Sequence, residues 1–145
     1  MKFVIDTCVV VSALKSRTGA SFVLVGMAST GQIDTVLTVP LVNEYEDVLR
    51  RPEVGLTHLT DKDIADLIDS LLVPAEWVTP HFTYRPLLDD PGDEMVLEAA
   101  INGGADIVTF NVRHFGPAAR FGVRVFKPGD LLKILREGGL GYGKE

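Results

Sequence analysis

An acidic side chain ends the first apolar run of the chain. Asp6 follows Phe3-Val4-Ile5, and a polar residue, Asn111, follows the apolar run IVTF at residues 107–110. Because burying an unpaired charge is costly, an acid at this place requires a partner. In sheets of parallel strands, ligands bind at the carboxyl ends of the strands, near the point where the strand order reverses. We therefore expect Asp6 and Asn111 to face one site.

Two further acids share the apolar face of a predicted helix. In the helix around Pro40, the spacing i, i+3, i+4, i+7 places on one face Leu41, Glu44, Tyr45 and Val48. In the helix that starts at Pro91, the same spacing gives Asp93, Val96, Leu97 and Ala100. Each helix therefore carries one acid on the side that is expected to be buried.

Each of these placements also has a structural explanation. Asp6 could cap the helix that follows it, Asp93 could complete a capping box with Asp90, and Glu44 could lie at the wet margin of its stripe. Together, however, the acids converge on one edge of one sheet. Two unit charges about 4 Å apart repel by roughly 4 kcal/mol at an effective dielectric of 20, so gathered acids need protons or cations. Oxygen ligands suit Mg²⁺ or Mn²⁺, whereas zinc prefers His and Cys.

The elements that would position these residues alternate between strand and helix. Strands are expected at residues 2–6, 35–38, 76–79, 107–110 and 123–126. Helices are expected at 8–16, 19–30, 40–50, 60–72, 91–102 and 128–136, with a turn or short helix at 114–121 and a loop at 81–90. This order predicts a three-layer α/β fold with a mainly parallel central sheet of four to five strands flanked by helices. We expect one domain over residues 1–137 and a flexible tail over 138–145.

Composition narrows the class of protein further. The 145 residues are 46% apolar, enough for one packed core, and the net charge is −6. This acidic balance argues against broad attraction to phosphate backbones, although acids in a metal site add to the total. There is no apolar run near the roughly 20 residues of a membrane span, no secretory signal at the start, and one cysteine, Cys8. We expect a cytoplasmic protein without a membrane segment.

Long stretches around these residues resemble the PIN-domain family of metal-dependent ribonucleases, many of which are toxins of bacterial toxin-antitoxin pairs. The stretches are FVIDTCVVVSAL, VPLVNEYEDVLRRPEV and LDDPGDEMVLEAAINGGADIVTFN. They match Asp6, Glu44 and Asp93 to the metal-binding acids of the family, and Asn111 stands where a fourth acid is most often found. The resemblance covers nearly the whole chain and implies a PIN-like fold.

The resemblance also implies an activity and roles for residues. The activity is hydrolysis of RNA phosphodiester bonds with Mg²⁺ or Mn²⁺; the three acids would bind the metal and Asn111 would position a water. Supporting residues that could orient the acids or add charge are Thr7, Thr109 and Asp90. Basic residues close in sequence to the site, and thus candidates for binding RNA phosphates, are Lys15, Arg17 and Arg113.

Three positions depart from the family pattern. Cys8 replaces a polar residue and is interpreted as a small buried hydrophobe, without a hydrogen bond to the metal site. Asn111 removes one negative charge, so a second metal would bind more weakly. His114 stands where an acid is sometimes found, so a compensating carboxylate is absent at that position; Asp89 and Asp90 could partly fill the gap, although turn and cap roles explain them as well.

Two other functions stay open at this point. One is a catalytically weak PIN-like module that binds RNA or protein. The other is a receiver-like phosphoacceptor domain, suggested by FKPGD after a strand, although such a domain needs paired acids where this chain has Asp6 alone. A dinucleotide-binding enzyme is disfavoured because no G-x-G-x-x-G follows the first strand. The resemblance further implies a small antitoxin partner and a homodimer.

Overall fold

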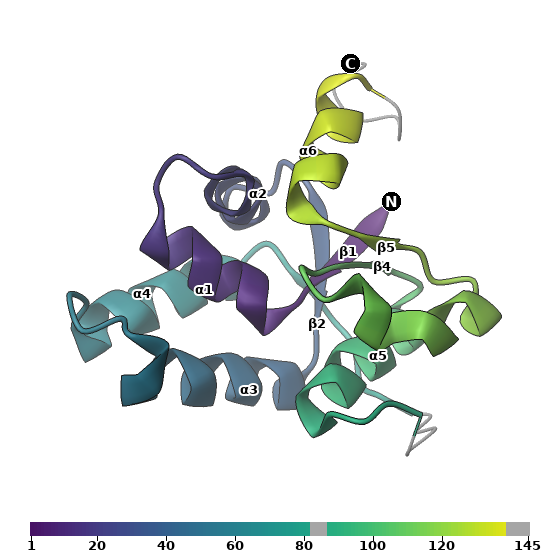
Figure 1. Cartoon of the computed structure of the whole chain (residues 1–145), viewed down its shortest axis with the longest axis horizontal. Coiled ribbons are helices and arrows are strands. Elements are labelled where there is room, and N and C mark those ends of the chain that lie inside the picture. Colours follow the sequence, from purple (N-terminus) through teal and green to yellow (C-terminus); the bar gives the residue numbers. More distant parts are fainter. Residues whose placement is uncertain (82–86, 139–145) are drawn as a thin grey trace.

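The computed structural model describes residues 1–81 and 87–138 and contains one sheet of parallel strands (Figure 1). The strands are β1 (Lys2–Ile5), β2 (Asp34–Leu37), β3 (Glu76–Trp77), β4 (Asp106–Val108) and β5 (Val125–Phe126). Their order is β3-β2-β1-β4-β5. The predicted α/β fold is confirmed. Receiver domains have the strand order 2-1-3-4-5, so the receiver interpretation is wrong.

Helices cover both faces of this sheet. The α-helices are α1 (Thr7–Lys15), α2 (Ala20–Ser29), α3 (Val39–Leu49), α4 (Asp61–Leu72), α5 (Pro91–Gly103) and α6 (Pro128–Arg136), and the 3₁₀ segments are η1 (Pro52–Val54) and η2 (Val112–Phe121). Parallel crossovers are right-handed, so the connections that run toward β3 and those that run toward β5 lie on opposite faces. Figure 1 accordingly shows α5 and η2 on the side of the sheet away from α2.

Local sequence signals set the ends of these helices. Thr60 and Asp63 form a reciprocal capping box at the start of α4, as the sequence predicts. The Thr38 hydroxyl accepts the Leu41 backbone N–H at 3.2 Å and so begins α3. Gly104, with φ of 63°, ends α5 in the left-handed conformation that glycine adopts without strain.

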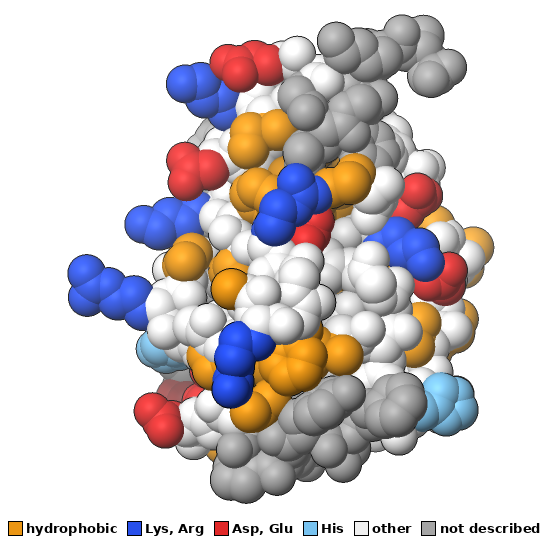
Figure 2. All heavy atoms as spheres, turned by 90° about the vertical axis from the view of Figure 1, so that its right-hand side faces the viewer, with side chains coloured by type: hydrophobic (Ala, Val, Ile, Leu, Met, Phe, Trp, Pro, Cys, Tyr) orange, Lys and Arg blue, Asp and Glu red, His pale blue; other side chains and the backbone are white. Residues whose placement is uncertain are grey.

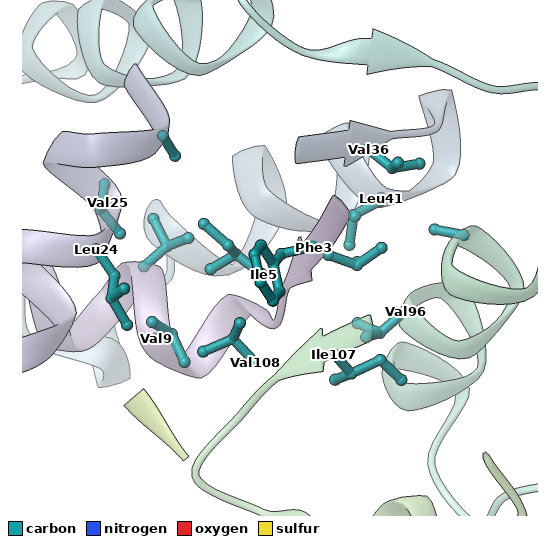
Figure 3. Packing of buried hydrophobic residues seen from close by; sticks show 14 of the residues in the cluster. Phe3, Ile5, Val9, Leu24, Val25, Val36, Leu41, Val96, Ile107 and Val108 are labelled. Atoms are coloured by element: carbon teal, nitrogen blue, oxygen red, sulfur yellow. The ribbon is translucent and has the colours of Figure 1, made fainter. Parts of the chain in front are cut away.

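The first strand lies at the centre of the hydrophobic core. Phe3, Val4 and Ile5 are all buried, as expected for a strand that is covered on both faces. Figure 3 shows Phe3 and Ile5 between Val9 and Leu24 on one side and helix α5 on the other. Because β1 is fixed on both faces and pairs with both β2 and β4, the residue that follows it is held in a defined position.

Four of the five strands are shorter than the sequence predicts, and the second has its predicted length but begins and ends one residue earlier. The first strand ends at Ile5 because Asp6 is already the N-cap residue of α1, and the second ends at Leu37 because Thr38 caps α3. The fourth begins at Asp106 and ends at Val108. Part of the expected loop at 81–90, and the expected tail beyond residue 138, lie outside the described residues.

Within the described part of the chain, no single helix is long and apolar enough to cross a membrane. The pair α1 and α2 passes such a test jointly by length and composition, but the two helices meet at an angle of 108°.

A close approach of α5 to the sheet gives a test of this packing. A Cβ atom added at Gly103 would lie 2.6 Å from Cγ1 of Val36. We expect Gly103→Ala to lower the free energy of unfolding by about 1–3 kcal/mol, because the sheet and helix must separate. Gly26→Ala in α2 is the matched control, since no atom lies within 4 Å of the added group; it should stabilise the helix by about 0.5–1 kcal/mol. Urea denaturation of both variants measures the difference, and equal stabilities would contradict the packing.

Candidate active site

Asp6 is held by side chains on both sides of the point where the strand order reverses. It is 6% exposed and directly follows β1. The Thr109 hydroxyl, just past β4, donates to Asp6 Oδ2 at 2.7 Å, and the Cys8 thiol donates to the same oxygen at 3.4 Å. The side chain of Asp6 makes no cap hydrogen bond to α1. Capping therefore does not explain the acid.

The Cys8 contact corrects the sequence interpretation. Burial, and then the negative charge of Asp6, raise the pKa of the Cys8 thiol to about 11, so the thiol keeps its proton at neutral pH. A protonated thiol can donate, and Cys8 therefore does make the hydrogen bond to Asp6 that was not expected of it. Burial also raises the pKa of the Asp6 carboxyl above 3.8, while the hydrogen bonds from Thr109 and Cys8 act in the opposite direction.

Glu44 is brought toward Asp6 by its neighbour in α3. The hydroxyl of Tyr45, which is 2% exposed, donates to the backbone carbonyl of Ile5, the residue before Asp6. This bond joins α3 to the end of β1. Glu44 is half-buried, as expected for the margin of an apolar stripe, and burial is the main reason that its pKa is raised.

Asp93 lies in the first turn of α5. Asp90 is the N-cap residue of this helix, and its side chain accepts the Gly92 N–H at 2.7 Å. The carboxylate of Asp93 does not complete a capping box; its Oδ2 instead lies 3.1 Å from Nδ1 of His114 in η2. An added Cβ at Gly92 would lie 3.0 Å from Oε1 of Glu44 and 3.1 Å from Oδ1 of Asp90. Glu44 of α3 therefore reaches the start of α5.

The carboxylates act on one another electrostatically. Burial raises the pKa of Asp93, and the charges of Asp6 and Asp90 raise it further. Asp6 and Asp90 also contribute to the raised pKa of Glu44. Like charges affect one another in this way only when they are close and poorly screened. The structure therefore places the three predicted acids, together with Asp90, in one electronegative region.

The region contains the type of oxygen ligand that a hard cation prefers, although its described side chains do not converge on one position. Among residues 1–81 and 87–138, no three His, Cys, Asp or Glu side chains stand close enough to hold an ion between them. The donors are nevertheless carboxylate oxygens, the ligands that Mg²⁺ and Mn²⁺ prefer. Their raised pKa values show that negative charge is unfavourable here without a compensating cation. Asp6, Glu44 and Asp93 are the residues that would hold it.

A pocket of about 280 Å³ opens beside Asp93. Its charged or titratable lining residues are Asp89, Asp90, Asp93, Arg113 and His114. Arg113 is thus the predicted phosphate contact that lies next to an acid of the site. A larger pocket of about 410 Å³ lies between α2 and α6, and none of the predicted acids lines it.

The other predicted residues have different environments. Asn111 is exposed, and its backbone N–H donates to the Thr109 hydroxyl at 3.0 Å. Thr7 is buried, and its backbone N–H adds to the hydrogen bonds from Thr109 and Cys8 that oppose the raised pKa of Asp6. Lys15 and Arg17 are exposed at and beyond the far end of α1, a helix that extends roughly 12 Å from Thr7 to Lys15 at about 1.5 Å per residue.

Sequence reasoning missed the role of Glu94. This side chain is 5% exposed, and its Oε1 accepts the backbone N–H groups of Leu87 and Leu88, both at 2.7 Å. Glu94 therefore fixes the segment that leads into Asp89 and Asp90. The signal in the sequence was a second acid directly after Asp93. The helical spacing assigns only one of two neighbouring residues to the buried face, so it selected Asp93 and passed over Glu94.

The raised pKa of Asp6 predicts how stability depends on pH. The folded chain binds this proton more tightly than the unfolded chain, so stability falls as the pH rises from 3.8 through the folded pKa. Each unit of pKa difference corresponds to about 1.4 kcal/mol. We expect metal-free Asp6→Asn to be more stable than the wild type at pH 7 and to lose this advantage below pH 3.8.

Chemical denaturation in EDTA across this pH range makes the measurement. Asp34→Asn, which changes an exposed acid at the start of β2, should stay within about 0.5 kcal/mol of the wild type. A wild type at least as stable as Asp6→Asn at pH 7 would contradict the assigned cost of burying this carboxylate.

Glu94 gives a separate test of the segment beside the pocket. Glu94→Ala removes the acceptor of two backbone N–H groups, which should lower the free energy of unfolding by about 2–4 kcal/mol. Amide hydrogen exchange should become faster at Leu87 and Leu88. Glu94→Gln keeps a carbonyl oxygen and should protect both amides better than Ala. Unchanged exchange in Glu94→Ala would show that other contacts hold the segment.

Comparison with known proteins agrees with the fold. A family model described as PIN domain matches residues 2–113, which include Asp6, Glu44, Asp93 and Asn111. A search of curated proteins found no match. PIN domains are generally nucleases and typically depend on divalent metals. The matched segment covers more than half of the chain and contains the whole acidic region, so the chain belongs to the PIN-domain family and has its nuclease-type fold.

Proposed function

We propose that this protein is a ribonuclease that hydrolyses RNA phosphodiester bonds with Mg²⁺ or Mn²⁺. The observation that carries the proposal is the position of buried Asp6 at the reversal of strand order, with Glu44 reaching the start of α5, the helix that carries Asp93. Family membership supports hydrolysis by a nuclease. The metal is inferred from the chemistry of these acids, and RNA as the substrate is inferred from the resemblance to PIN-domain ribonucleases.

Each acid has a distinct part in this function. Asp6 is the most rigid, because Thr109 and Cys8 hold one of its oxygens and both its neighbours along the chain are buried. Glu44 is more exposed and can turn toward a ligand between α3 and α5. When bound, a divalent cation supplies a Lewis acid that lowers the pKa of water and offsets the charge of the phosphate. Asn111, exposed beside Thr109, is placed to orient a water through its amide.

In this proposal the protein contacts RNA close to the acidic region and not over a broad basic surface. Arg113 lines the pocket beside Asp93 and offers a bidentate contact for a phosphate. Figure 2 shows the face on the right-hand side of Figure 1, where acidic and basic side chains are interspersed between hydrophobic patches. Such a face does not create the continuous positive field that attracts nucleic acid without regard to structure. Lys15 and Arg17 stay predictions as RNA contacts, and their distance along α1 suits only a longer substrate.

A catalytically weak module that binds RNA or protein is the second candidate. Exposed Asn111 in place of an acid favours it, and so does the separation of the carboxylates in the described residues. Calorimetric titration with Mn²⁺ distinguishes the two functions. A nuclease should bind the ion through Asp6, Glu44 and Asp93, whereas a module that has lost catalysis should release little or no heat.

The resemblance in sequence to toxin nucleases supports two further proposals, a small antitoxin that covers the acidic region and a homodimer. A cytoplasmic location is a third proposal, supported by the single cysteine of the sequence. Co-expression with the product of a neighbouring short gene, followed by cleavage assays of the purified pair, tests the first of them. An inhibited complex would support it.

Cleavage of a single-stranded RNA oligonucleotide tests the proposed function. Asp6→Asn should reduce Mn²⁺-dependent cleavage by about 100-fold or more, because the interaction at stake is worth several kcal/mol. Glu44→Gln should reduce it as well, and EDTA should abolish it. Gel analysis of a labelled oligonucleotide makes the measurement.

The matched control is a neighbouring acid on the same helix. Glu46 is exposed on α3, so Glu46→Gln should cleave at the wild-type rate. Cleavage by Asp6→Asn at the wild-type rate would refute the assignment of the active site.

A further inference from the structure

His114 makes a polar contact with an acid of the proposed site. Its Nδ1 lies 3.1 Å from Oδ2 of Asp93. The two residues come from different elements: Asp93 from the first turn of α5, and His114 from η2, which follows β4. The imidazole is largely exposed, with 56% of its side-chain surface accessible, whereas only 12% of the Asp93 side chain is accessible. Both residues line the pocket beside the site.

The direction of this hydrogen bond follows from the groups involved. An ionised carboxylate has no proton to donate, so the imidazole donates from Nδ1 and the carboxylate accepts. The contact joins two separate elements, because Asp93 belongs to α5 and His114 to η2. His114 therefore restrains one oxygen of Asp93 from outside the helix that carries it.

We propose that His114 is the positioning residue for Asp93: it holds Oδ2 through Nδ1–H and leaves Oδ1 for the divalent cation. This inference rests on the proposed function. Carboxylates that bind metals are themselves oriented by hydrogen bonds, and loss of such a partner typically costs about 10–100-fold in metal affinity. Such orientation matters more here because Asn111 provides no fourth carboxylate.

The exposure of His114 argues against a role in stability alone. Exposed ion pairs typically contribute about 0–1 kcal/mol to folding, so the fold does not require this contact. Asp93 is also fixed by its place in the first turn of α5. The N-cap of this helix is Asp90, so the start of the helix does not depend on His114. Removing the imidazole should therefore release the Asp93 side chain without unfolding the chain.

Three substitutions of His114 distinguish the roles of its two ring nitrogens. The amide nitrogen of His114→Asn can occupy the place of Nδ1, whereas that of His114→Gln can occupy the place of Nε2; His114→Ala has neither. Calorimetry with Mn²⁺ alone should give a near wild-type Kd for His114→Asn. For His114→Gln and His114→Ala we expect the Kd to be raised about 10–100-fold. His58→Ala, at an exposed histidine just before α4, is the control and should bind as the wild type does. Urea denaturation should show all metal-free variants to be folded.

Each outcome of this experiment is decisive. Wild-type Mn²⁺ affinity in His114→Ala would overturn the inference. Wild-type Mn²⁺ affinity in His114→Gln together with weak binding by His114→Asn would also overturn it, because Nε2 would then be the functional atom. If these results came with metal binding and RNA cleavage by the wild type, the proposed function would stand without this inference. Absence of Mn²⁺ binding by the wild type would overturn both.

Discussion

The hydrogen bond from Thr109 to Asp6 is the interaction on which the site depends. It crosses from the end of β4 to the end of β1, at the point where the order of strands reverses. Main-chain bonds reinforce it, since the Asp6 N–H donates to the Val108 carbonyl at 2.9 Å. A buried carboxylate would otherwise be left with too few partners. The sheet register therefore determines the position of the central acid.

The remaining acids are placed by contacts to this same edge. Tyr45 fixes α3 to the carbonyl of Ile5, and a glycine at position 92 leaves the space that Glu44 and Asp90 share. The first contact involves no carboxylate, whereas the second leaves room for the carboxylate oxygens of Glu44 and Asp90 themselves. The backbone and the neighbouring side chains thus set the positions from which the carboxylates act.

The spacing of apolar residues was sufficient to predict the order of the helices and strands. The continuous apolar run identified β1, the one-face spacing located Glu44 and Asp93, and the last helix has its predicted bounds, 128–136. Side-chain partners were less predictable. The thiol of Cys8 donates because burial and Asp6 keep it protonated, and Glu94 turns away from Asp93 to hold Leu87 and Leu88. Both effects depend on tertiary neighbours, which a single sequence does not reveal.

A site of this kind exchanges stability for the capacity to bind. Three raised carboxyl pKa values mean that the metal-free fold carries a cost at neutral pH, and hydrogen bonds from Thr109, Cys8 and His114 reduce that cost only in part. Any ligand that binds the folded state and not the unfolded state stabilises the fold by mass action. A divalent cation would therefore act as a structural and a chemical component at once, because the buried negative charge that attracts it is the charge that disfavours the metal-free fold.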